Sequence, residues 1–316
     1  MKILHVTYHS GCAKNIEYVC KELGYSLETQ FANWNYNISA NRANEIYNKY
    51  KDYYNQFDVI ITSDTGPLAR IFLQNTFKKL IIWVCNRFDY ADMATNDCNF
   101  PDKEFYELYK NAANNTNVKI FSYTKFEHEY AREFRGVELG KKVLKPCAFI
   151  DNSEKTLNLK DTFFIPPYHN DSIFMNLKAK CDDLGIKTYA GRYNGPKDLE
   201  DCNGIIHIPY AWSNLALFEN WTLGNVYFIP SKDFLIQLSQ KNNFFWSPPF
   251  SIKHIESSEW YLPEHKDLFI YFNSWDELKE LHCNAELIKN KKNKCLNFMQ
   301  NHTKNMLKIW DDIIIK

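Results

Sequence analysis

The chain has 316 residues, a length that suits two domains, and its 38 basic and 38 acidic side chains cancel, which argues against a nucleic-acid partner because no basic surface is expected. No apolar run approaches the roughly 20 residues that cross a bilayer, so we expect no transmembrane segment. The nine cysteines include no Cys-x-x-Cys pair and the N-terminus has no long apolar signal sequence, which indicates reduced thiols and a cytoplasmic protein.

Strand and helix patterns alternate through the first half of the chain. The clearest strand is the apolar run DVIIT, which leads into a turn that contains Asp64 and Gly66. We expect strands at 3–6, 58–62, 80–84, 118–123 and 143–144, and helices at 14–23, 68–77 and 105–112. Continuous apolar strands separated by helices are typical of a parallel sheet covered on both faces, so this half is predicted to be an α/β domain.

The same pattern begins again after the polar stretch DNSEKTLNLKD, which we interpret as a linker. We expect strands at 162–165, 187–190, 204–208, 226–229 and 268–272, helices at 173–184, 234–238 and 275–281, short helices after Pro196 and Ser213, and one more from 285 to the end. The predicted α/β chain therefore divides into domains at 1–152 and 153–295. A C-terminal helix, 296–316, is predicted to pack back on the first domain through Met306, Ile309 and Trp310.

The segment 207–231, HIPYAWSNLALFENWTLGNVYFIPS, predicts a strand, a turn, a helix and a second strand in succession. Such units bind anions where the helix begins, because the first backbone N–H groups of a helix have no partner within it. We expect Ser213 to be the N-cap. The residues expected to bind an anion here are Tyr210, Ser213, Asn214 and Leu215. The alternative is that Ser213 only caps the helix.

Two further groups are candidates for the same ligand. Gly191 and Arg192 follow a predicted strand, where a glycine permits close approach of a ligand and a guanidinium can bind a diphosphate through two hydrogen bonds. Glu219, within the predicted helix, can accept hydrogen bonds from ribose hydroxyls. Alternatively, Arg192 and Glu219 are solvated side chains.

Leu217-Phe218-Glu219, followed by Gly224 and an apolar strand, resembles the C-terminal half of the Glu-x7-Glu motif of retaining GT-B glycosyltransferases. The resemblance covers about residues 160 to 282. The first glutamate of the motif would fall on Ala211, which is not an acid, and this departure favours inversion over retention.

The resemblance implies a specific architecture and activity. Two Rossmann-like domains would face each other across a cleft, with the C-terminal helix crossing back to the first domain. The second domain would bind a UDP- or GDP-linked sugar as substrate, with no other cofactor. A hexosyl or deoxyhexosyl group would move to a hydroxyl of a carbohydrate or glycoconjugate, which the first, acceptor-side domain would hold.

The resemblance also directs attention to strand ends in the first domain. Gly11 lies in the turn after the first predicted strand, a position where GT-B enzymes often have a glycine-rich turn, and Arg87 follows a later strand. An inverting transfer needs a base that takes the acceptor proton, and the candidates are Asp64 first, then His9 and Asp89. The alternatives are that the two aspartates cap helices or form ion pairs, and that His9 packs in a turn.

Other classes of site are absent from the sequence. There is no Gly-x-Gly-x-x-Gly after the first strand, no Walker A lysine and no Gly-x-Ser-x-Gly. No Asp-x-Asp pair follows a strand, so we expect activity without a metal, and we interpret Glu127-His128-Glu129 as a solvated helix face. Two alternatives stay open: a nucleotide-sugar epimerase or hydrolase of the same fold, and a non-catalytic protein that binds nucleotides or carbohydrates.

Overall fold

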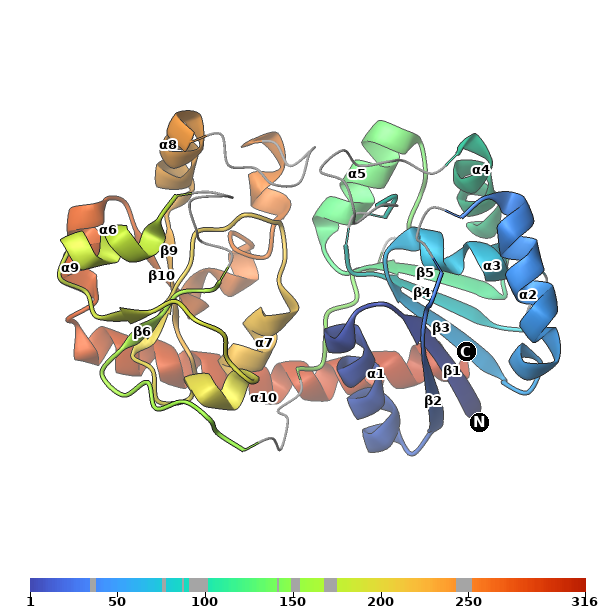
Figure 1. Ribbon diagram of the computed structural model, residues 1–316, viewed down its shortest axis with the longest axis horizontal. Helices are drawn as coiled ribbons and strands as arrows, with labels where there is room; N and C mark the ends of the chain where they lie inside the picture. Colours follow the sequence, from blue (N-terminus) through green and yellow to red (C-terminus); the bar gives the residue numbers. More distant parts are fainter. Residues whose placement is uncertain are drawn as a thin grey trace. The chain divides into compact units, whose positions relative to one another are not determined.

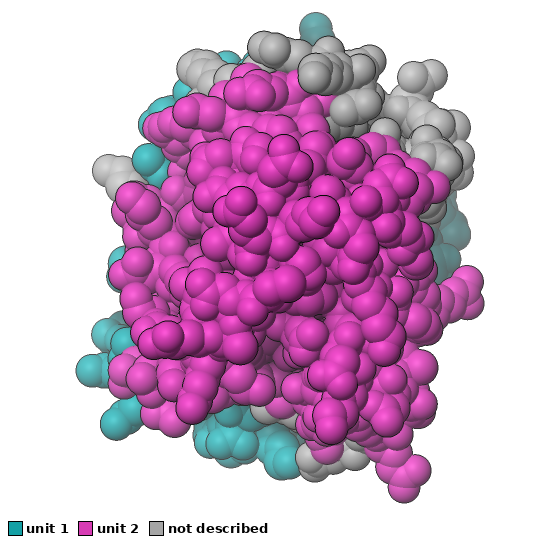
Figure 2. Space-filling model, turned by 90° about the vertical axis from the view of Figure 1, so that its left-hand side faces the viewer, with its two compact units in different colours: residues 1–147, 304–316 teal, residues 148–303 magenta. Residues whose placement is uncertain are grey.

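The structure is a computed structural model that describes residues 1–34, 38–75, 78–86, 88–90, 102–140, 142–148, 154–167, 175–242 and 252–316. The chain forms two compact units, which Figure 2 distinguishes by colour. Unit 1 contains Met1–Cys147 and Lys304–Lys316, and unit 2 contains Ala148–Thr303. The chain thus passes between units at 147–148 and 303–304, where we had expected 152–153 and 295–296.

Unit 1 is built on a parallel sheet (Figure 1). Its strands are β1 (Lys2–Thr7), β2 (Ser26–Phe31), β3 (Val59–Asp64), β4 (Leu80–Val84) and β5 (Val118–Ser122). They lie in the order β2-β1-β3-β4-β5. The three central strands are almost wholly buried, as in a sheet covered by helices on each side, and most of their buried residues are apolar.

The helices of unit 1 differ in part from the expected ones. They are α1 (Ser10–Leu23), α2 (Ala40–Tyr54), a 3-10 turn η1 (Gly66–Ala69), α3 (Arg70–Leu73), α4 (Lys103–Ala112) and α5 (Lys125–Arg135). The expected helix 68–77 is therefore a 3-10 turn followed by a single α-helical turn. The expected strand at 143–144 is reduced to one bridge, from Ser122 to Val143.

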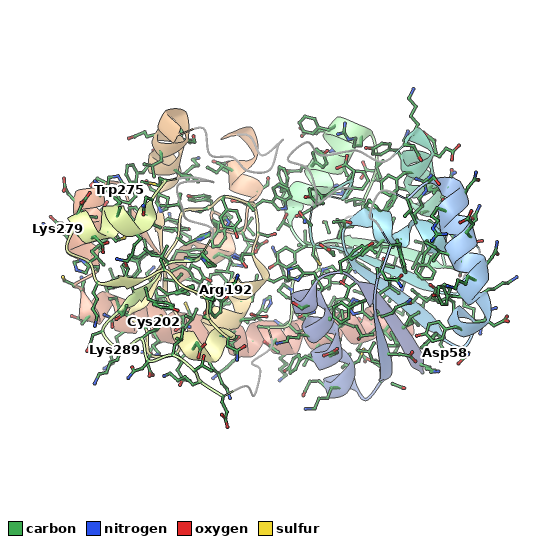
Figure 3. The ribbon with its side chains drawn as sticks, viewed as in Figure 1. Asp58, Arg192, Cys202, Trp275, Lys279 and Lys289 are labelled. Carbon is green, nitrogen blue, oxygen red and sulfur yellow. The ribbon has the colours of Figure 1, made fainter. Side chains whose placement is uncertain are left out.

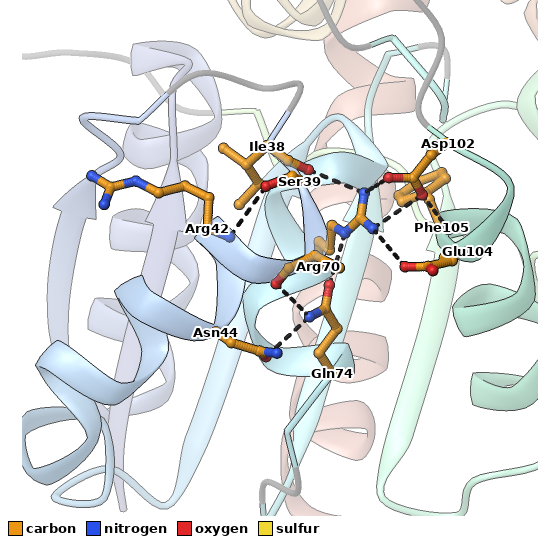
Figure 4. A network of polar contacts seen from close by, with 10 residues as sticks. Ile38, Ser39, Arg42, Asn44, Arg70, Gln74, Asp102, Glu104 and Phe105 are labelled. Atoms are coloured by element: carbon orange, nitrogen blue, oxygen red, sulfur yellow. Dashed lines mark hydrogen bonds and ion pairs between the residues drawn. The ribbon is translucent and has the colours of Figure 1, made fainter.

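One buried guanidinium connects three of these helices (Figure 4). Arg70, 1% exposed, donates to both carboxylate oxygens of Asp102 at 2.8 and 3.0 Å and to the Ile38 carbonyl at 3.0 Å. Asp102 is also the N-cap of α4, and Gln74 accepts from the Arg70 Nε at 2.7 Å. Because each donor has a partner, the cost of burying this charge is offset.

Unit 2 repeats the strand order of unit 1. Its strands are β6 (Phe163–Phe164), β7 (Thr188–Tyr189), β8 (Gly204–Ile206), β9 (Tyr227–Pro230) and β10 (Phe269–Phe272). They are parallel and lie in the order β10-β9-β8-β6-β7. Numbered within the unit, both sheets read 2-1-3-4-5.

Unit 2 has helices between and after these strands. They are α6 (Leu177–Asp183), η2 (Pro196–Leu199), α7 (Leu215–Thr222), α8 (Lys232–Asn242), η3 (Ile252–Ser257), η4 (Pro263–Leu268), α9 (Trp275–Leu281) and α10 (Ala285–Ile315). In the described part of the chain, no helix combines the length and apolarity that a membrane span requires.

The last helix, α10, begins in unit 2 and ends in unit 1. At its unit 1 end, Trp310 is fully buried against Trp83 of β4. The two rings pack edge to face, with their centroids 5.5 Å apart. Lys79 donates to the Ile314 carbonyl at 2.7 Å, so a cation lies where the helix dipole is negative. The predicted return of the C-terminal helix to the first domain is confirmed.

Candidate functional site

Topology fixes where each sheet can bind a ligand. In open parallel sheets, ligands bind beyond the carboxyl ends of the strands at the point where the strand order reverses. That point lies between β1 and β3 in unit 1 and between β6 and β8 in unit 2. Asp64 ends β3, and Gly11, Leu215 and Glu219 lie in helices that follow such strands, which for Gly11 differs from the expected turn. The other predicted residues that the structure describes lie on loops after these strands or their neighbours.

In unit 1, Asp64 ends β3 and His9 follows β1, so the paired strands bring both residues to the same sheet edge. Asp64 is 5% exposed and has a φ of 91°, which is rare for a residue other than glycine. Its carbonyl oxygen accepts from the backbone N–H groups of Cys85 and Asn86 at 2.8 and 3.0 Å. The turn after β3 is therefore held by the turn after β4.

His9 has a structural task as the N-cap of α1. Its Nδ1 accepts from the Gly11 backbone N–H at 3.1 Å. The proton of a neutral His9 ring must then be on Nε2. The nitrogen that could accept a further proton is already a hydrogen-bond acceptor, which makes His9 less suited than Asp64 to act as a base.

Two thiols and a phenol surround the Asp64 turn. Hydrogen bonding from Cys85, opposed by burial and aided by His9, lowers the pKa of Cys12 to about 7. Burial raises the pKa of Cys85. Burial, and then the charge of Asp64, raise the pKa of Tyr8. These groups form a compact ionisable cluster at the switch point of the first sheet.

Asp89, another candidate base, is completely buried among donors. Its carboxylate accepts from Arg135 Nε at 2.7 Å, from Tyr130 at 3.0 Å and from Tyr106 at 3.0 Å. Three side chains thus donate to this one carboxylate, which offsets the cost of burying it. The arrangement corresponds to the ion-pair alternative, and the partner of Asp89 is Arg135. Arg87 lies outside the described residues.

In unit 2, Gly191 and Arg192 follow β7, and Arg192 is exposed (Figure 3). The Tyr189 hydroxyl donates to the Arg192 carbonyl at 2.8 Å, which folds this ring over the turn. A Cβ at residue 191 would lie 2.4 Å from the ring, so only glycine allows this arrangement without a shift.

The helix start after β8 differs by one residue from the expected one. Asn214, not Ser213, is the N-cap of α7, and its side-chain oxygen accepts from Ala216 N at 2.9 Å. The backbone N–H groups of Ser213 and Leu215 donate no hydrogen bond to the part of the chain that the structure describes. Both therefore remain available at the positive end of a helix dipole.

Several polar groups of unit 2 gather around the buried phenol of Tyr227. Burial raises the pKa of Tyr227, and Tyr193, Glu219 and Tyr210 lie near enough for their charges to raise it further, whereas a hydrogen bond from Asn220 lowers it. Groups from the loop after β7, the loop after β8 and helix α7 therefore act on the same phenol.

Residues far along the chain hold the loop after β8, and sequence reasoning missed them. Trp260 Nε1 donates to the Ala211 carbonyl at 2.8 Å, and the Glu259 N–H donates to the Trp212 carbonyl at 2.8 Å. The Trp260 ring also lies 4.4 Å from the His207 ring. Nothing in the spacing of these residues signals their contact, because some 50 residues separate the partners.

A correction concerns the segment interpreted as a solvated helix face. Glu127 is fully buried, and its carboxylate accepts from the Thr124 backbone N–H at 2.8 Å and from the Thr124 hydroxyl. It forms the capping box of α5, which a Thr-x-x-Glu pattern could have revealed. Among the described residues, no group of three His, Cys, Asp or Glu side chains could hold a metal ion.

One pocket lies away from the switch points. It has a volume of about 570 Å³ and is lined by residues of α4, β5 and α5, with the segment 138–140. Val118, at the amino end of β5, lies on its wall. We do not assign it to the site, because the carboxyl ends of the strands carry the convergent polar groups.

No protein-family model matches the chain, and no curated protein matches it by sequence. Solved structures do resemble it over its whole length. The glycosyltransferase SnogD from Streptomyces nogalater is 9% identical, with a TM-score of 0.52 and 99% of each chain covered. The S. aureus protein MnaA, solved with UDP, is also 9% identical, with a TM-score of 0.52, covering 100% of this chain and 98% of that one.

At this identity the likeness concerns the fold. The chain has the GT-B fold, with two Rossmann-like α/β units and a C-terminal helix shared between them, which confirms the predicted fold class.

Proposed function

We propose that the protein is a glycosyltransferase that moves a hexosyl or deoxyhexosyl group from a UDP- or GDP-linked donor to a hydroxyl of a carbohydrate or glycoconjugate. The observation that carries the proposal is the pair of available backbone N–H groups at Ser213 and Leu215, at the start of α7. Such a helix start binds phosphate groups. The fold shared with SnogD supports the reaction, and the fold shared with MnaA, solved with UDP, supports the ligand.

Unit 2 would bind the donor. Ser213, Asn214 and Leu215 would bind the diphosphate through the helix start, and the exposed Arg192 guanidinium would add a fork of donors to the same oxygens. Glu219, four residues into α7, would accept hydrogen bonds from the ribose. The departing nucleoside diphosphate carries the charge that develops during transfer, so these same groups would stabilise the transition state.

Unit 1 would supply the base. Asp64 stands at the switch point with low exposure, and neither of the other candidates has a geometry as suitable. It would take the proton of the acceptor hydroxyl as that oxygen attacks the anomeric carbon of the donor. The expected outcome is inversion, since Ala211 occupies the position of the motif's first glutamate.

Calorimetric titration with UDP and GDP tests the donor site. Arg192→Ala and Glu219→Ala should each weaken binding of the preferred nucleotide by about 1–3 kcal/mol, because each removes a charge-assisted hydrogen bond. Lys187→Ala is the matched control, since Lys187 is exposed at the amino-terminal side of β7, on the opposite edge of the sheet. Wild-type affinity in both site variants, with both folded, would refute the donor assignment.

We propose that transfer needs no metal, because the start of α7 and the Arg192 guanidinium would supply the positive charge at the diphosphate. Product formation should continue in excess EDTA, and loss of activity with recovery on adding Mn²⁺ would contradict this. The same assay separates the alternatives. Free sugar or an epimer formed without acceptor would indicate a hydrolase or epimerase, and nucleotide binding without any turnover would indicate a binding protein.

A further inference from the structure

A chain of buried polar side chains lies under the turn that carries His9. It consists of His5 and Thr7 on β1 and Ser63 on β3, and all three are at most 1% exposed. His5 Nε2 lies 2.8 Å from Ser63 Oγ, and Ser63 Oγ lies 3.0 Å from Thr7 Oγ1. The Thr7 oxygen then accepts from the backbone N–H of His9 at 3.2 Å.

The protons in this chain can be placed so that each of these contacts is a hydrogen bond. Thr7 donates its own proton to the Ser63 carbonyl at 3.5 Å, so its oxygen accepts from both Ser63 and His9. Ser63 donates to Thr7 and must therefore accept from His5, which places the His5 proton on Nε2. Burial lowers the pKa of His5 to about 3, so the ring stays neutral and keeps this role near pH 7.

The corresponding paired strands of unit 2 have apolar side chains, and a buried polar residue, His207, follows only after β8. In unit 2, the paired strands β6 and β8 that flank the switch point carry Phe163, Phe164, Ile205 and Ile206, and that sheet has the same strand order. Burying hydroxyls and an imidazole costs more free energy than burying apolar side chains, and only the hydrogen bonds that they form offset this cost. These bonds hold two specific places: the main chain of His9, in the turn after β1, and Ser63, the residue before Asp64 on β3.

We propose that His5, Ser63 and Thr7 are positioning residues that hold the His9 turn and the Asp64 turn in the geometry that transfer to the acceptor requires. The three residues do not touch substrate. They act through the backbone of the two loops that meet at the switch point of unit 1. The inference rests on the proposed glycosyltransferase function and extends it to how the base is oriented.

Thr7→Val tests the proposal because it keeps the shape of the side chain and removes the oxygen that accepts from His9. Thr7→Ser keeps the hydroxyl and is the conservative rescue. Thr62→Val is the matched control, since Thr62 is fully buried on β3 and its hydroxyl has no hydrogen-bond partner in the described part of the chain. Ser63→Ala breaks the same chain at another point and serves if Thr7→Val does not fold.

Two measurements are made on each full-length variant. Amide hydrogen exchange at His9, followed by NMR, reports whether the turn is held. Steady-state release of UDP from UDP-glucose and of GDP from GDP-mannose, with a panel of sugar acceptors, gives kcat and KM, and calorimetry with UDP and GDP checks that unit 2 is intact.

Thr7→Val should speed exchange at His9 by about fivefold or more, the effect of losing one hydrogen bond. It should lower kcat by about 10- to 100-fold, because a displaced catalytic group loses its alignment, with KM for the donor and nucleotide affinity unchanged. Thr7→Ser should restore the slow exchange at His9 and the wild-type kcat, and Thr62→Val should change neither of these two quantities.

Wild-type kcat in a folded Thr7→Val and in Ser63→Ala would overturn the proposal while the proposed function stands. An equal loss of kcat in Thr62→Val would also overturn it, since the effect would then be general to buried threonines of the sheet. A wild-type protein that turns over neither donor would overturn the proposed function, and with it this inference.

Discussion

The two units share one strand order but differ in the side chains at the point where that order reverses. In unit 1 the reversal is lined by small polar and ionisable groups, among them Thr7, Ser63 and Asp64. In unit 2 it is lined by aromatic rings, and Phe164 meets Tyr193 at 5.0 Å while His207 meets Trp260 at 4.4 Å. One scaffold thus presents two chemically different sets of side chains at its two switch points.

The units also differ in how the chain completes them. Unit 2 is continuous in sequence, whereas unit 1 needs the last 13 residues to cover its sheet. Trp310 and the carbonyl end of α10 pack there against β4 and Lys79. A change in the tail should therefore affect the stability of unit 1 without touching the strand ends of unit 2.

The largest expected effect is a loss of sugar transfer without a loss of nucleotide binding. Asp64→Asn should lower the rate of sugar transfer by about 10²–10⁴, because the base is removed, and leave nucleotide binding nearly intact. Single-turnover transfer and calorimetry measure the two quantities. Asp58→Asn is the control, since Asp58 is exposed just before the other end of the same strand (Figure 3), where its side chain accepts from the Lys2 N–H. Full activity in Asp64→Asn would show that unit 1 supplies its base from elsewhere.

Trp310→Ala tests the dependence of unit 1 on the tail. Removing a fully buried indole should cost about 3–5 kcal/mol of unfolding free energy, and the loss should appear in hydrogen exchange of β1, β3 and β4 before it appears in unit 2. Ile309→Ala, at a neighbouring position that is 37% exposed, should have a small effect. Uniform loss of protection in both sheets would contradict the distinction between the units.

In unit 2, one buried carboxyl is expected to make a pH-dependent contribution to stability. Burial opposes ionisation of Asp198, but hydrogen bonds from Asn194, Thr156 and Leu157 outweigh it and lower the pKa of its carboxyl. The stabilisation is therefore present above the unfolded value, 3.8, and is lost as the pH falls through the folded pKa. Asp198→Asn should cost about 1–3 kcal/mol at pH 7, because a buried acceptor of several hydrogen bonds is weakened.

Urea unfolding at pH 7 and at pH 3 measures this difference. The gap between wild type and Asp198→Asn should shrink at the lower pH, where the wild-type carboxyl begins to bind a proton. Asp183→Asn, at an exposed position of α6, should show no gap at either pH. If the difference in unfolding free energy between wild type and Asp198→Asn is the same at both pH values, packing and not ionisation determines the loss of stability.

The smallest expected effect concerns the turn after β7. Gly191→Ala forces the Tyr189 ring to move, since the new Cβ would lie 2.4 Å from it, and the bond from its hydroxyl to the Arg192 carbonyl is then strained. We expect nucleotide affinity to fall roughly threefold to tenfold, equivalent to about 1 kcal/mol. Tyr189→Phe should shift affinity in the same direction. Tighter binding in either variant would mean that the ring closes the site and does not support it.

Strands with a continuous apolar run were predictable, and β3, β4 and β5 lie where the sequence indicated. Strand β2 and helix α2 were not predicted, because their sequences, SLETQF and a tyrosine-rich polar stretch, lack a strong apolar period. An edge strand such as β2 is defined by its neighbour: it pairs with β1 along six residues and leaves its own side chains largely exposed.

The candidate site likewise has features that the sequence predicted and features that it did not. The βαβ unit around α7 was evident from a strand, a helix start and a glycine in succession, whereas its exact cap was not, since Ser213 and Asn214 are both good N-caps. The role of Asp89 could not be read either, because Arg135, Tyr130 and Tyr106 reach it from two helices well separated from it in the chain.

The sequence by itself determined the number of domains, their α/β class and which loops follow buried strands, because apolar periodicity and chain order are local properties. Only the tertiary structure decided which of those loops meet. It placed Asp64 at the switch point of unit 1, paired Asp89 with Arg135, and brought His5 within hydrogen-bond distance of Ser63. Those outcomes depend on strand register and helix packing, in which residues 40 to 60 positions apart become neighbours and one residue of shift would turn each side chain to the opposite face.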